Sequence, residues 1–373
     1  MTNFNRKVLI VGAGPVGMTL AIMLAMKGIP CRIIDKREKP TALLRAIGIS
    51  MSSEKIFSDI GVLKEIEKKG FRVSELHLSH YSYGKIELEF GKICPAISGY
   101  LHVYQPSIEG ILVEKLNQLG IEIGRQHELV ALKDKGAHIE AEIATKTGTR
   151  EYSEYDYVIG CDGASGVVSS LADFETEEKL YKYDFVLTDV SLIEGSSLSA
   201  TYWHINPEGY LAVLPGPENR ARVIFSIEHE HPALTIDPTY LSNFVKESIG
   251  LSLSFSEILW EARGLFRHKR AICGRKGNIF LAGDSYHIFS PIGGLNMNFG
   301  LQDAEYLSRK LFSEKYNEER SPKILETIKF TEFLTRLMAE PATHEALWCG
   351  FIRKLKSDNS FGKKVFANFL GSQ

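Results

Sequence analysis

The residues near the N-terminus restrict the fold more than any other part of the sequence. An apolar run at 7–11 (KVLIV) predicts a strand buried on both faces, and a helical apolar pattern follows over 17–28. Residues 30–35 (PCRIID) return to strand character. The chain therefore opens with a parallel βαβ unit, which indicates an α/β fold.

The turn between the first strand and the helix reads GAGPVG. Gly12 makes the tight turn, Gly14 lets a pyrophosphate approach the backbone, and Gly17 lets the helix pack closely on the strand. Asp35 ends the second strand, where a carboxylate binds the two hydroxyls of a ribose. The unit predicts FAD or NAD rather than a 2'-phosphorylated nucleotide. The alternative is a tight turn that only packs a helix on a sheet.

Composition and charge argue against several other classes. The chain has 373 residues and a net charge of -2, so nothing in its overall charge favours nucleic acid. Charged residues or glycines interrupt every apolar stretch before about 18 residues, so we expect no transmembrane helix. We find no signal peptide and expect a cytoplasmic protein. The five scattered cysteines indicate buried thiols in a reducing compartment, and we expect no metal site.

The rest of the chain predicts a second sheet inserted into the first domain. Residues 180–230 alternate between apolar and polar side chains, as an antiparallel sheet does, and 278–282 is again a short buried strand. From 322 onward the pattern is helical and increasingly basic. We expect further helices over 52–69, 106–119 and 239–249, and extended chain over 72–90, 127–145, 155–160 and 255–272.

A second Gly-rich junction between a strand and a helix reads LAGDSYHIFSPIGGLNMNFGLQDA at 281–304. Three other segments accompany it: the N-terminal unit, RAIGIS, and YVIGCDGASGVV. Together they resemble the class A flavoprotein monooxygenases, of the para-hydroxybenzoate and phenol hydroxylase type, along essentially the whole chain. The resemblance implies FAD as the cofactor, with NAD(P)H as the electron donor.

The resemblance also implies how FAD is held. Asp284 would bond the ribityl chain, while the Gly293–Gly294 turn and the helix from about Asn296 would direct amide groups at the flavin ring. Arg45 and Gln105 match residues that the family places near the cofactor. The complete set expected to bind FAD is Gly12, Gly14, Pro15, Val16, Gly17, Asp35, Lys36, Arg45, Gln105, Asp162, Gly163, Gly283, Asp284, Pro291, Gly293, Gly294, Leu295, Asn296 and Met297.

The fold class implied is α/β, a Rossmann-like FAD-binding domain with an inserted antiparallel substrate sheet and a C-terminal helical segment. We expect the FAD-binding domain over 1–72, 100–178 and 273–320, the substrate-binding domain over 73–99 and 179–272, and C-terminal helices over 321–373. A basic amphipathic helix over 351–367 leaves three alternatives: it contacts a membrane surface, caps the substrate pocket, or covers the sheet.

The family chemistry is hydroxylation of a phenolic, aromatic or polyketide-like small molecule with O2, through a flavin C4a-hydroperoxide. The protein must supply a dry pocket. Candidates for its wall are Tyr202, His204, Tyr210 and Pro291, with Trp203, His102 and Tyr104 as further aromatic side chains and His287 as a match to a family histidine. No residue is assigned as catalytic from the sequence.

The middle motif departs from the family pattern. The family reads Asp-Gly-x-x-Ser with an arginine three places later, whereas this chain has Gly166 and Ser169 at those two positions. Loss of the arginine removes a charge-assisted bond worth about 1.5–3 kcal/mol. The choice between NADH and NADPH therefore stays open. The sequence also leaves open whether the protein is a monomer or a homodimer. So do three alternative functions: an oxygenase that inactivates a tetracycline-like antibiotic, a non-oxygenating flavin reductase, and a flavin-binding protein without turnover.

Overall fold

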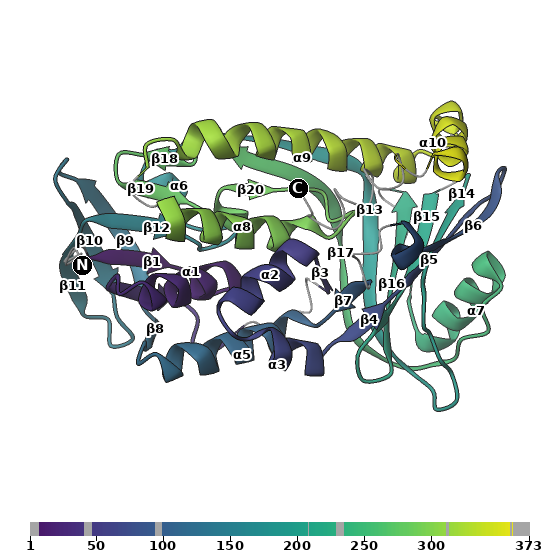
Figure 1. The fold of residues 1–373 in the computed structure, drawn as a ribbon, viewed down its shortest axis with the longest axis horizontal. Helices are drawn as coiled ribbons and strands as arrows, with labels where there is room; N and C mark the ends of the chain where they lie inside the picture. The colour runs from purple at the N-terminus through teal and green to yellow at the C-terminus, as the bar shows by residue number, and fades with distance from the viewer. Residues whose placement is uncertain are drawn as a thin grey trace.

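The computed structural model describes residues 7–40, 47–93, 99–207, 209–228, 235–310, 313–358 and 360. The molecule is elongated. The N-terminal βαβ unit lies at one end and a large sheet at the other, and α9 (Tyr316–Ala339) runs along the top of both (Figure 1). The α/β class expected from the sequence is confirmed.

The first sheet has six strands and is built around β1 (Val8–Val11), whose four residues are all buried. Helix α1 (Pro15–Met26) connects β1 to β2 (Cys31–Asp35), and the two strands pair in parallel. The remaining strands are β8 (Ile123–Arg125) beyond β2, and β12 (Tyr157–Gly160), β19 (Ile279–Leu281) and β18 (Arg275–Lys276) on the other side. The carboxyl ends of the parallel strands meet at one edge, as nucleotide binding requires.

The second sheet has eight strands in the order β20-β17-β13-β16-β15-β14-β5-β6. Their bounds are β5 (Glu75–His80), β6 (Gly84–Glu89), β13 (Thr176–Leu192), β14 (Thr201–Asn206), β15 (Gly209–Gly216), β16 (Arg220–Glu228), β17 (Phe255–Ala271) and β20 (His287–Ile288). This large sheet is antiparallel, as expected, except that β14 and β5 pair in parallel. The long strands β13 and β17 pair antiparallel from Thr176 and Ala271 to Leu192 and Phe255, so they connect the two ends of the molecule.

Two small sheets complete the β structure. The strands β9 (Glu128–Asp134), β10 (Ile139–Ala144) and β11 (Arg150–Tyr155) form a meander. The strands β3 (Gly48–Ile49), β4 (Phe71–Val73) and β7 (Tyr100–His102) form a three-stranded sheet. The last strand, β7, leads directly into α5 (Gln105–Gln118).

One expected helix is interrupted. The pattern over 52–69 predicted a continuous helix, but the chain forms α2 (Met51–Asp59) and α3 (Leu63–Lys68). Gly61 lies between them with a φ of 74°, a backbone conformation that favours glycine and ends a helix. The other helices are α4 (Phe90–Ile93), α6 (Val168–Leu171), α7 (Pro238–Ile249), α8 (Leu295–Lys310) and α10 (Glu345–Ser357).

The basic segment expected to be helical over 351–367 falls only partly within the described chain, because residues 361–373 lie outside it. In α10, Trp348 is buried, and its indole Nε1 donates to the carbonyl of Leu337 at 2.7 Å. Its ring also lies 5.2 Å from His80 of β5. The described part of α10 therefore covers the sheet, which is one of the three alternatives above.

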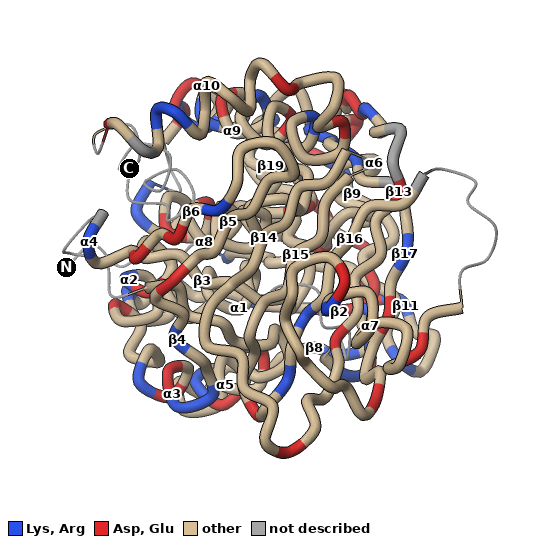
Figure 2. Tube along the Cα trace, turned by 90° about the vertical axis from the view of Figure 1, so that its right-hand side faces the viewer, with Lys and Arg blue, Asp and Glu red and all other residues tan. Residues whose placement is uncertain are grey.

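Surface charge and free thiols complete the description. Figure 2 shows acidic and basic residues mixed around the periphery, in agreement with the net charge of -2. Within the described ranges, no helix is both long and apolar enough to span a membrane. Cys94 lies outside these ranges, Cys161 is buried, and the partly exposed cysteines are Cys31, Cys273 and Cys349. The expectation of buried thiols is confirmed for Cys161 and is wrong for the three partly exposed cysteines.

Candidate FAD and substrate site

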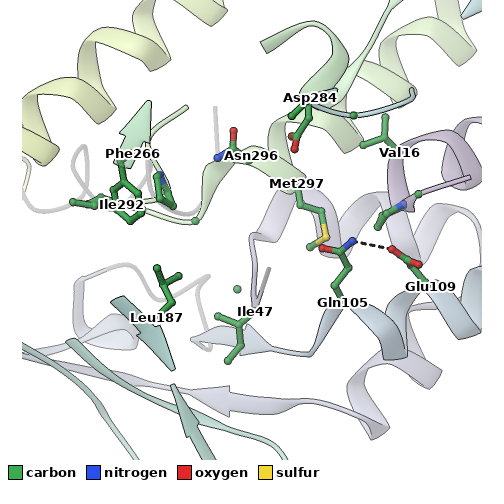
Figure 3. A pocket seen from close by; sticks show the side chains of 18 of the residues that line it. Val16, Ile47, Gln105, Glu109, Leu187, Phe266, Asp284, Ile292, Asn296 and Met297 are labelled. Carbon is green, nitrogen blue, oxygen red and sulfur yellow. Dashed lines mark hydrogen bonds between the residues drawn. The ribbon is translucent and has the colours of Figure 1, made fainter. Parts of the chain in front are cut away.

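A cavity of about 830 Å³ runs between the two sheets. Figure 3 shows Val16, Asp284 and Met297 at one end, and Leu187 and Phe266 at the other. The expected cofactor residues that line the cavity are Gly12, Gly14, Pro15, Val16, Asp35, Lys36, Gln105, Asp162, Gly163, Asp284, Pro291, Gly293, Gly294, Asn296 and Met297. Gly17, Gly283 and Leu295 lie behind this surface, and Arg45 falls outside the described residues.

The first Gly-rich turn packs so closely that two of its glycines cannot carry a side chain. A Cβ atom on Gly12 would lie 2.2 Å from the carbonyl oxygen of Cys161, and Gly12 has a φ of 107°. A Cβ on Gly17 would lie 2.0 Å from the carbonyl oxygen of Gly12. A Cβ on Gly14, in contrast, would meet no atom within 4 Å. Gly14 therefore faces open space, as a residue beside a bound phosphate must.

Asp35 is held by several donors at the end of β2. Its carboxylate accepts from the amide of Ala13 at 2.9 Å and from the amide of Arg37 at 2.8 Å, and the Arg37 side chain adds bonds of 3.1 and 3.2 Å. Arg125 lies 3.7 Å away. Burial alone raises the pKa of Asp35, but the bonds from Arg37 and Ala13 outweigh it, so the net pKa is below its ordinary value. The carboxylate is ionised, and both of its oxygens accept hydrogen bonds from Ala13 and Arg37.

The second Gly-rich junction rests on a buried ionic cluster. Asp303 of α8 accepts from the amide of Gly283 at 3.0 Å and lies 2.6 Å from His287 Nε2. Arg320 of α9 donates to its other oxygen at 2.8 Å through Nε. Burial raises the pKa of Asp303, but Arg320 and His287 together lower it below its ordinary value. The cluster fixes the backbone immediately before Asp284, and it gives His287 a structural partner.

The two Gly-rich junctions contact each other. A Cβ on Gly300 would lie 2.7 Å from Val16 Cγ2 and 3.0 Å from the Cα of Gly283. A Cβ on Gly283, which has a φ of 60°, would lie 3.0 Å from the same Val16 methyl group. Residues near position 16 and near position 300 thus form one continuous surface at the strand ends.

Two asparagines fix the turn after Pro291. The side chain of Asn296 bonds both the amide and the carbonyl of Phe289, at 2.7 and 2.9 Å. Asn298 accepts from the amide of Ser50 and the hydroxyl of Ser53, and donates to the carbonyls of Gly48 and Gly294, at 2.8–3.0 Å. These bonds attach the N-terminus of α8 to β3 and α2.

The altered middle motif has a local physical reason. Asp162 accepts from the Ser285 hydroxyl at 2.7 Å and from the amide of Val168 at 3.0 Å, so it links β12 to the Gly-Asp pair. A Cβ on Gly166 would lie 2.1 Å from the Asp162 carboxylate. The serine that the family places there does not fit beside Asp162 in this conformation. Asp162 itself is already occupied by protein donors.

The substrate end of the cavity is mostly apolar. Tyr210 and Pro291 line it, but Tyr202 and His204 do not. This corrects the sequence expectation for those two residues. Side chains alternate along β14, so Trp203 faces the cavity, while His204 bonds Ser79. Tyr104, also expected in the wall, does not line the cavity. The apolar lining consists of Val73, Leu76, Phe90, Leu187, Trp203, Ala212, Leu214, Ile224, Phe266, Ile292 and Met338.

A buried ion pair lies in the same wall. Arg222 of β16 and Asp189 of β13 are directly opposite in the sheet and form two bonds of 2.8 Å. They are 2% and 0% exposed. The sequence offered no direct indication of this pair, because 33 residues separate its members. Removal of either partner would leave an uncompensated buried charge.

Further residues that the sequence did not reveal are Asp303, Asn298 and Glu109. Gln105 donates to Glu109 at 2.8 Å across one turn of α5, and both line the cavity (Figure 3). Asp303 lies on the apolar stripe of its helix with Gly300 and Leu307, all at helical spacing. A charged residue on an apolar stripe is a signal that sequence analysis could have used.

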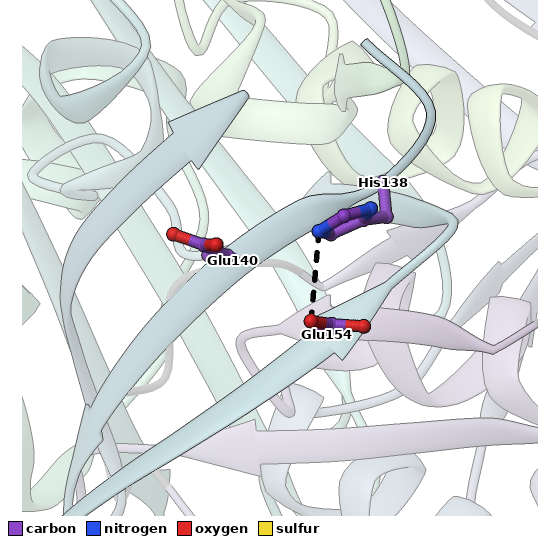
Figure 4. A group of neighbouring side chains, drawn as sticks. All are labelled: His138, Glu140 and Glu154. Atoms are coloured by element: carbon purple, nitrogen blue, oxygen red, sulfur yellow. Dashed lines mark ion pairs between the residues drawn. The ribbon is translucent and has the colours of Figure 1, made fainter. Parts of the chain in front are cut away.

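A second group of ligand-type side chains lies away from the cavity, on the β9–β11 meander (Figure 4). His138 Nε2 lies 3.6 Å from Glu154, and Glu140 already pairs with Lys135 at 3.2 Å. The two glutamates are exposed. These contacts are ordinary surface ion pairs, and we assign no metal to them.

The donor groups of the cavity fit FAD. No side chain caps the first turn of α1, so its amide groups are available to a diphosphate. Asp35 lines the cavity at the end of β2, where a ribose hydroxyl would take the place of the Arg37 side chain on its carboxylate. Gly294, with a φ of 64°, faces open space, since a Cβ there would meet no atom within 4 Å. A planar ring can therefore lie against this turn.

Comparisons with known proteins agree with this reading. The FAD binding domain family matches residues 5–331. Rifampicin monooxygenase of Rhodococcus hoagii is 27% identical over 367 residues, covering 91% of this chain and 73% of that protein. The fold matches p-nitrophenol 4-monooxygenase PnpA of Pseudomonas putida DLL-E4, with a TM-score of 0.82, 19% identity, and coverage of 98% and 99%. It also matches the Diels-Alderase PyrE3, with a TM-score of 0.81, 22% identity, and coverage of 98% and 80%.

The match to the family model extends over most of the chain, and the Gly12 and Gly293–Gly294 turns and Asp284 line one cavity. The chain belongs to the FAD binding domain family and, within it, to the class A FAD-dependent aromatic hydroxylases.

Proposed function

We propose that the protein hydroxylates a phenolic or polyketide-like small molecule, using FAD, NAD(P)H and O2. The observation that carries this proposal is the continuity of the cavity from the Gly12 turn to the apolar wall at Trp203 and Phe266. One space can therefore hold both the cofactor and an aromatic ring. When bound, FAD supplies electron transfer from NAD(P)H and activation of O2.

The residues of the chain perform the remaining tasks in this proposal. Gly12, Gly14 and the first turn of α1 hold the diphosphate, Asp35 the ribose, and Asp284 the ribityl chain. The Gly293–Gly294 turn supports the ring. The apolar wall excludes water and orients the substrate, which favours oxygen transfer over loss of peroxide. The division into domains at the boundaries given above is part of the same proposal.

The test is NAD(P)H oxidation by the FAD-loaded protein, measured with and without a panel of phenols, with released peroxide subtracted. We expect a phenol to accelerate oxidation and to be converted to a product heavier by one oxygen atom. If no phenol in the panel stimulates oxidation above the basal rate, the hydroxylase proposal is wrong.

A flavin protein without oxygen transfer is the second candidate. The structural neighbour PyrE3 is a Diels-Alderase, and Gly166 and Ser169 replace the family residues of the middle motif. This candidate predicts FAD binding with no NAD(P)H oxidation in the same assay.

The use of NAD(P)H as electron donor supports a cytoplasmic location. We also propose that the protein is a monomer or a homodimer, and light scattering would distinguish these two states.

A further inference from the structure

His102 is the best-placed hydrogen-bonding group at the seam between the two sheets. It ends β7, pairs with Gly48 of β3, and lines the cavity while being only 4% exposed. Its Nδ1 lies 2.6 Å from the carbonyl oxygen of Pro215 at the end of β15. A carbonyl only accepts, so Nδ1 carries the proton and donates it. This bond fixes both the ring orientation and the tautomer.

The remaining ring nitrogen, Nε2, is therefore an acceptor, and it has no partner among the described residues. Burial is the main cause that lowers the pKa of His102 to about 4. The bond to Pro215 acts to raise this pKa, and the nearby Arg222 guanidinium acts to lower it further. The imidazole is thus neutral near pH 7. It is far too weak a base to remove a proton from a phenol, but it can accept a hydrogen bond from one.

The surrounding charges restrict the ligand further. Two guanidinium groups line this part of the cavity, and both are paired: Arg222 with Asp189 at 2.8 Å, and Arg267 with Glu178 at 2.9 Å. A substrate carboxylate would need an unpaired cation to offset its desolvation. The wall instead offers apolar side chains and the Tyr210 hydroxyl, whose ring lies in the same cavity.

We propose that His102 Nε2 accepts the hydroxyl proton of an uncharged phenol in a hydrogen bond, and so selects neutral phenols over aryl ethers and aromatic carboxylates. This inference rests on the proposed function and deepens it. It makes His102 a substrate-binding residue that orients the hydroxyl without deprotonating it.

The test compares 2-naphthol with 2-methoxynaphthalene, which has the same ring but no donor. Dissociation constants are measured from the change in flavin absorbance of the FAD-loaded protein. We expect the parent to bind 2-naphthol roughly tenfold more tightly than the ether, as one net hydrogen bond allows. His102→Phe should reduce this preference to below roughly twofold.

The matched control is His77→Phe. His77 pairs with Glu75 at 3.1 Å on β5 and does not line the cavity, so this variant should keep the parental preference. Retention of the preference in His102→Phe would overturn the inference while leaving the hydroxylase proposal intact. Failure of the parent to bind 2-naphthol at all, together with no stimulated NAD(P)H oxidation, would overturn both.

A second measurement does not depend on a variant that folds. In parent protein carrying ¹⁵N-histidine, 2-naphthol should shift the His102 Nε2 signal as an accepted hydrogen bond does, while the ring stays neutral. An Nε2 signal that does not move at saturating 2-naphthol would contradict the inference.

Discussion

At the scale of single residues, the site requires glycine at three positions where any side chain would clash. Gly12, Gly17 and Gly166 each lie where a Cβ would come within 2.2 Å of another atom. The first two were assigned from the GAGPVG pattern. Gly166 appeared in the sequence only as a departure from the family, because its neighbour, the Asp162 carboxylate, takes its position from Ser285 far along the chain.

Restoring the family residue at this position should therefore harm the protein. Gly166→Ser places a Cβ about where the Asp162 carboxylate lies and displaces it from Ser285 and Val168. We expect a loss of about 1–3 kcal/mol in the free energy of unfolding and weaker FAD retention. Chemical denaturation and the ratio of flavin to protein absorbance measure the two effects.

The matched control is Gly110→Ala. Gly110 lies inside α5, and a Cβ there would meet no atom within 4 Å, so the change should be neutral or stabilising by up to about 1 kcal/mol. Equal stability of Gly166→Ser and the parent would show that Asp162 can relax, and would remove the steric explanation for the altered motif.

At the scale of elements, the sequence predicted whether a segment is a helix or a strand. It predicted less well which side of a strand faces the cavity and where a helix is interrupted. Apolar runs and the GAGPVG turn identified β1, α1 and β2 because their signals are local. The cavity-facing side of β14 could not be chosen, because Tyr202, Trp203 and His204 are all aromatic or polar-aromatic and give no alternation. Gly61 between α2 and α3 was overlooked for a related reason, since one glycine within a helical pattern is often tolerated.

The attachment of α8 to β3 and α2 makes an element-scale prediction. Asn298→Ala removes four hydrogen bonds and leaves the buried amide of Ser50 and the carbonyl of Gly48 without this partner. We expect about 3 kcal/mol of destabilisation and loss of flavin from the Gly293–Gly294 side. Thermal unfolding and flavin release report the two effects separately.

Asn117→Ala provides the control, because Asn117 is an exposed residue near the end of α5. It should change stability by less than about 0.5 kcal/mol. An Asn298→Ala protein that melts and retains flavin like this control would mean that packing alone holds α8 in place.

At the scale of the whole molecule, buried histidines and aspartates make stability depend on pH. The folded pKa of His102 is lowered from about 6.5 to about 4, so the unfolded chain binds this proton first as pH falls. His102 therefore lowers the free energy of unfolding by up to about 3 kcal/mol as the pH falls from 6.5 to 4. Below about pH 4, Asp35 and Asp303, whose pKa values are lowered, lose the stabilisation that they give when ionised.

Thermal unfolding from pH 7 to pH 4.5 tests this dependence. The groups that face His102 are the Pro215 carbonyl, Arg222 with its partner Asp189, and Tyr100, whose ring lies 6.3 Å away. Burial raises the pKa of Asp189, although its bonds to Arg222 act in the opposite direction. His102→Phe should lose less stability than the parent over this range. Parallel curves for the two proteins would assign the acid sensitivity to other groups.

The contact among Val16, Gly283 and Gly300 affects the order of events during synthesis of the chain. The contact joins the segment after β1, which ends at Val11, to α8, which begins at Leu295. During synthesis, the N-terminal turn emerges from the ribosome long before its counterpart, at roughly 5–20 residues per second. FAD can therefore complete its site only after the chain has been synthesised beyond Gly300. We expect flavin capture to follow the synthesis of both junctions, because chains cut short before Gly300 would lack part of the second one.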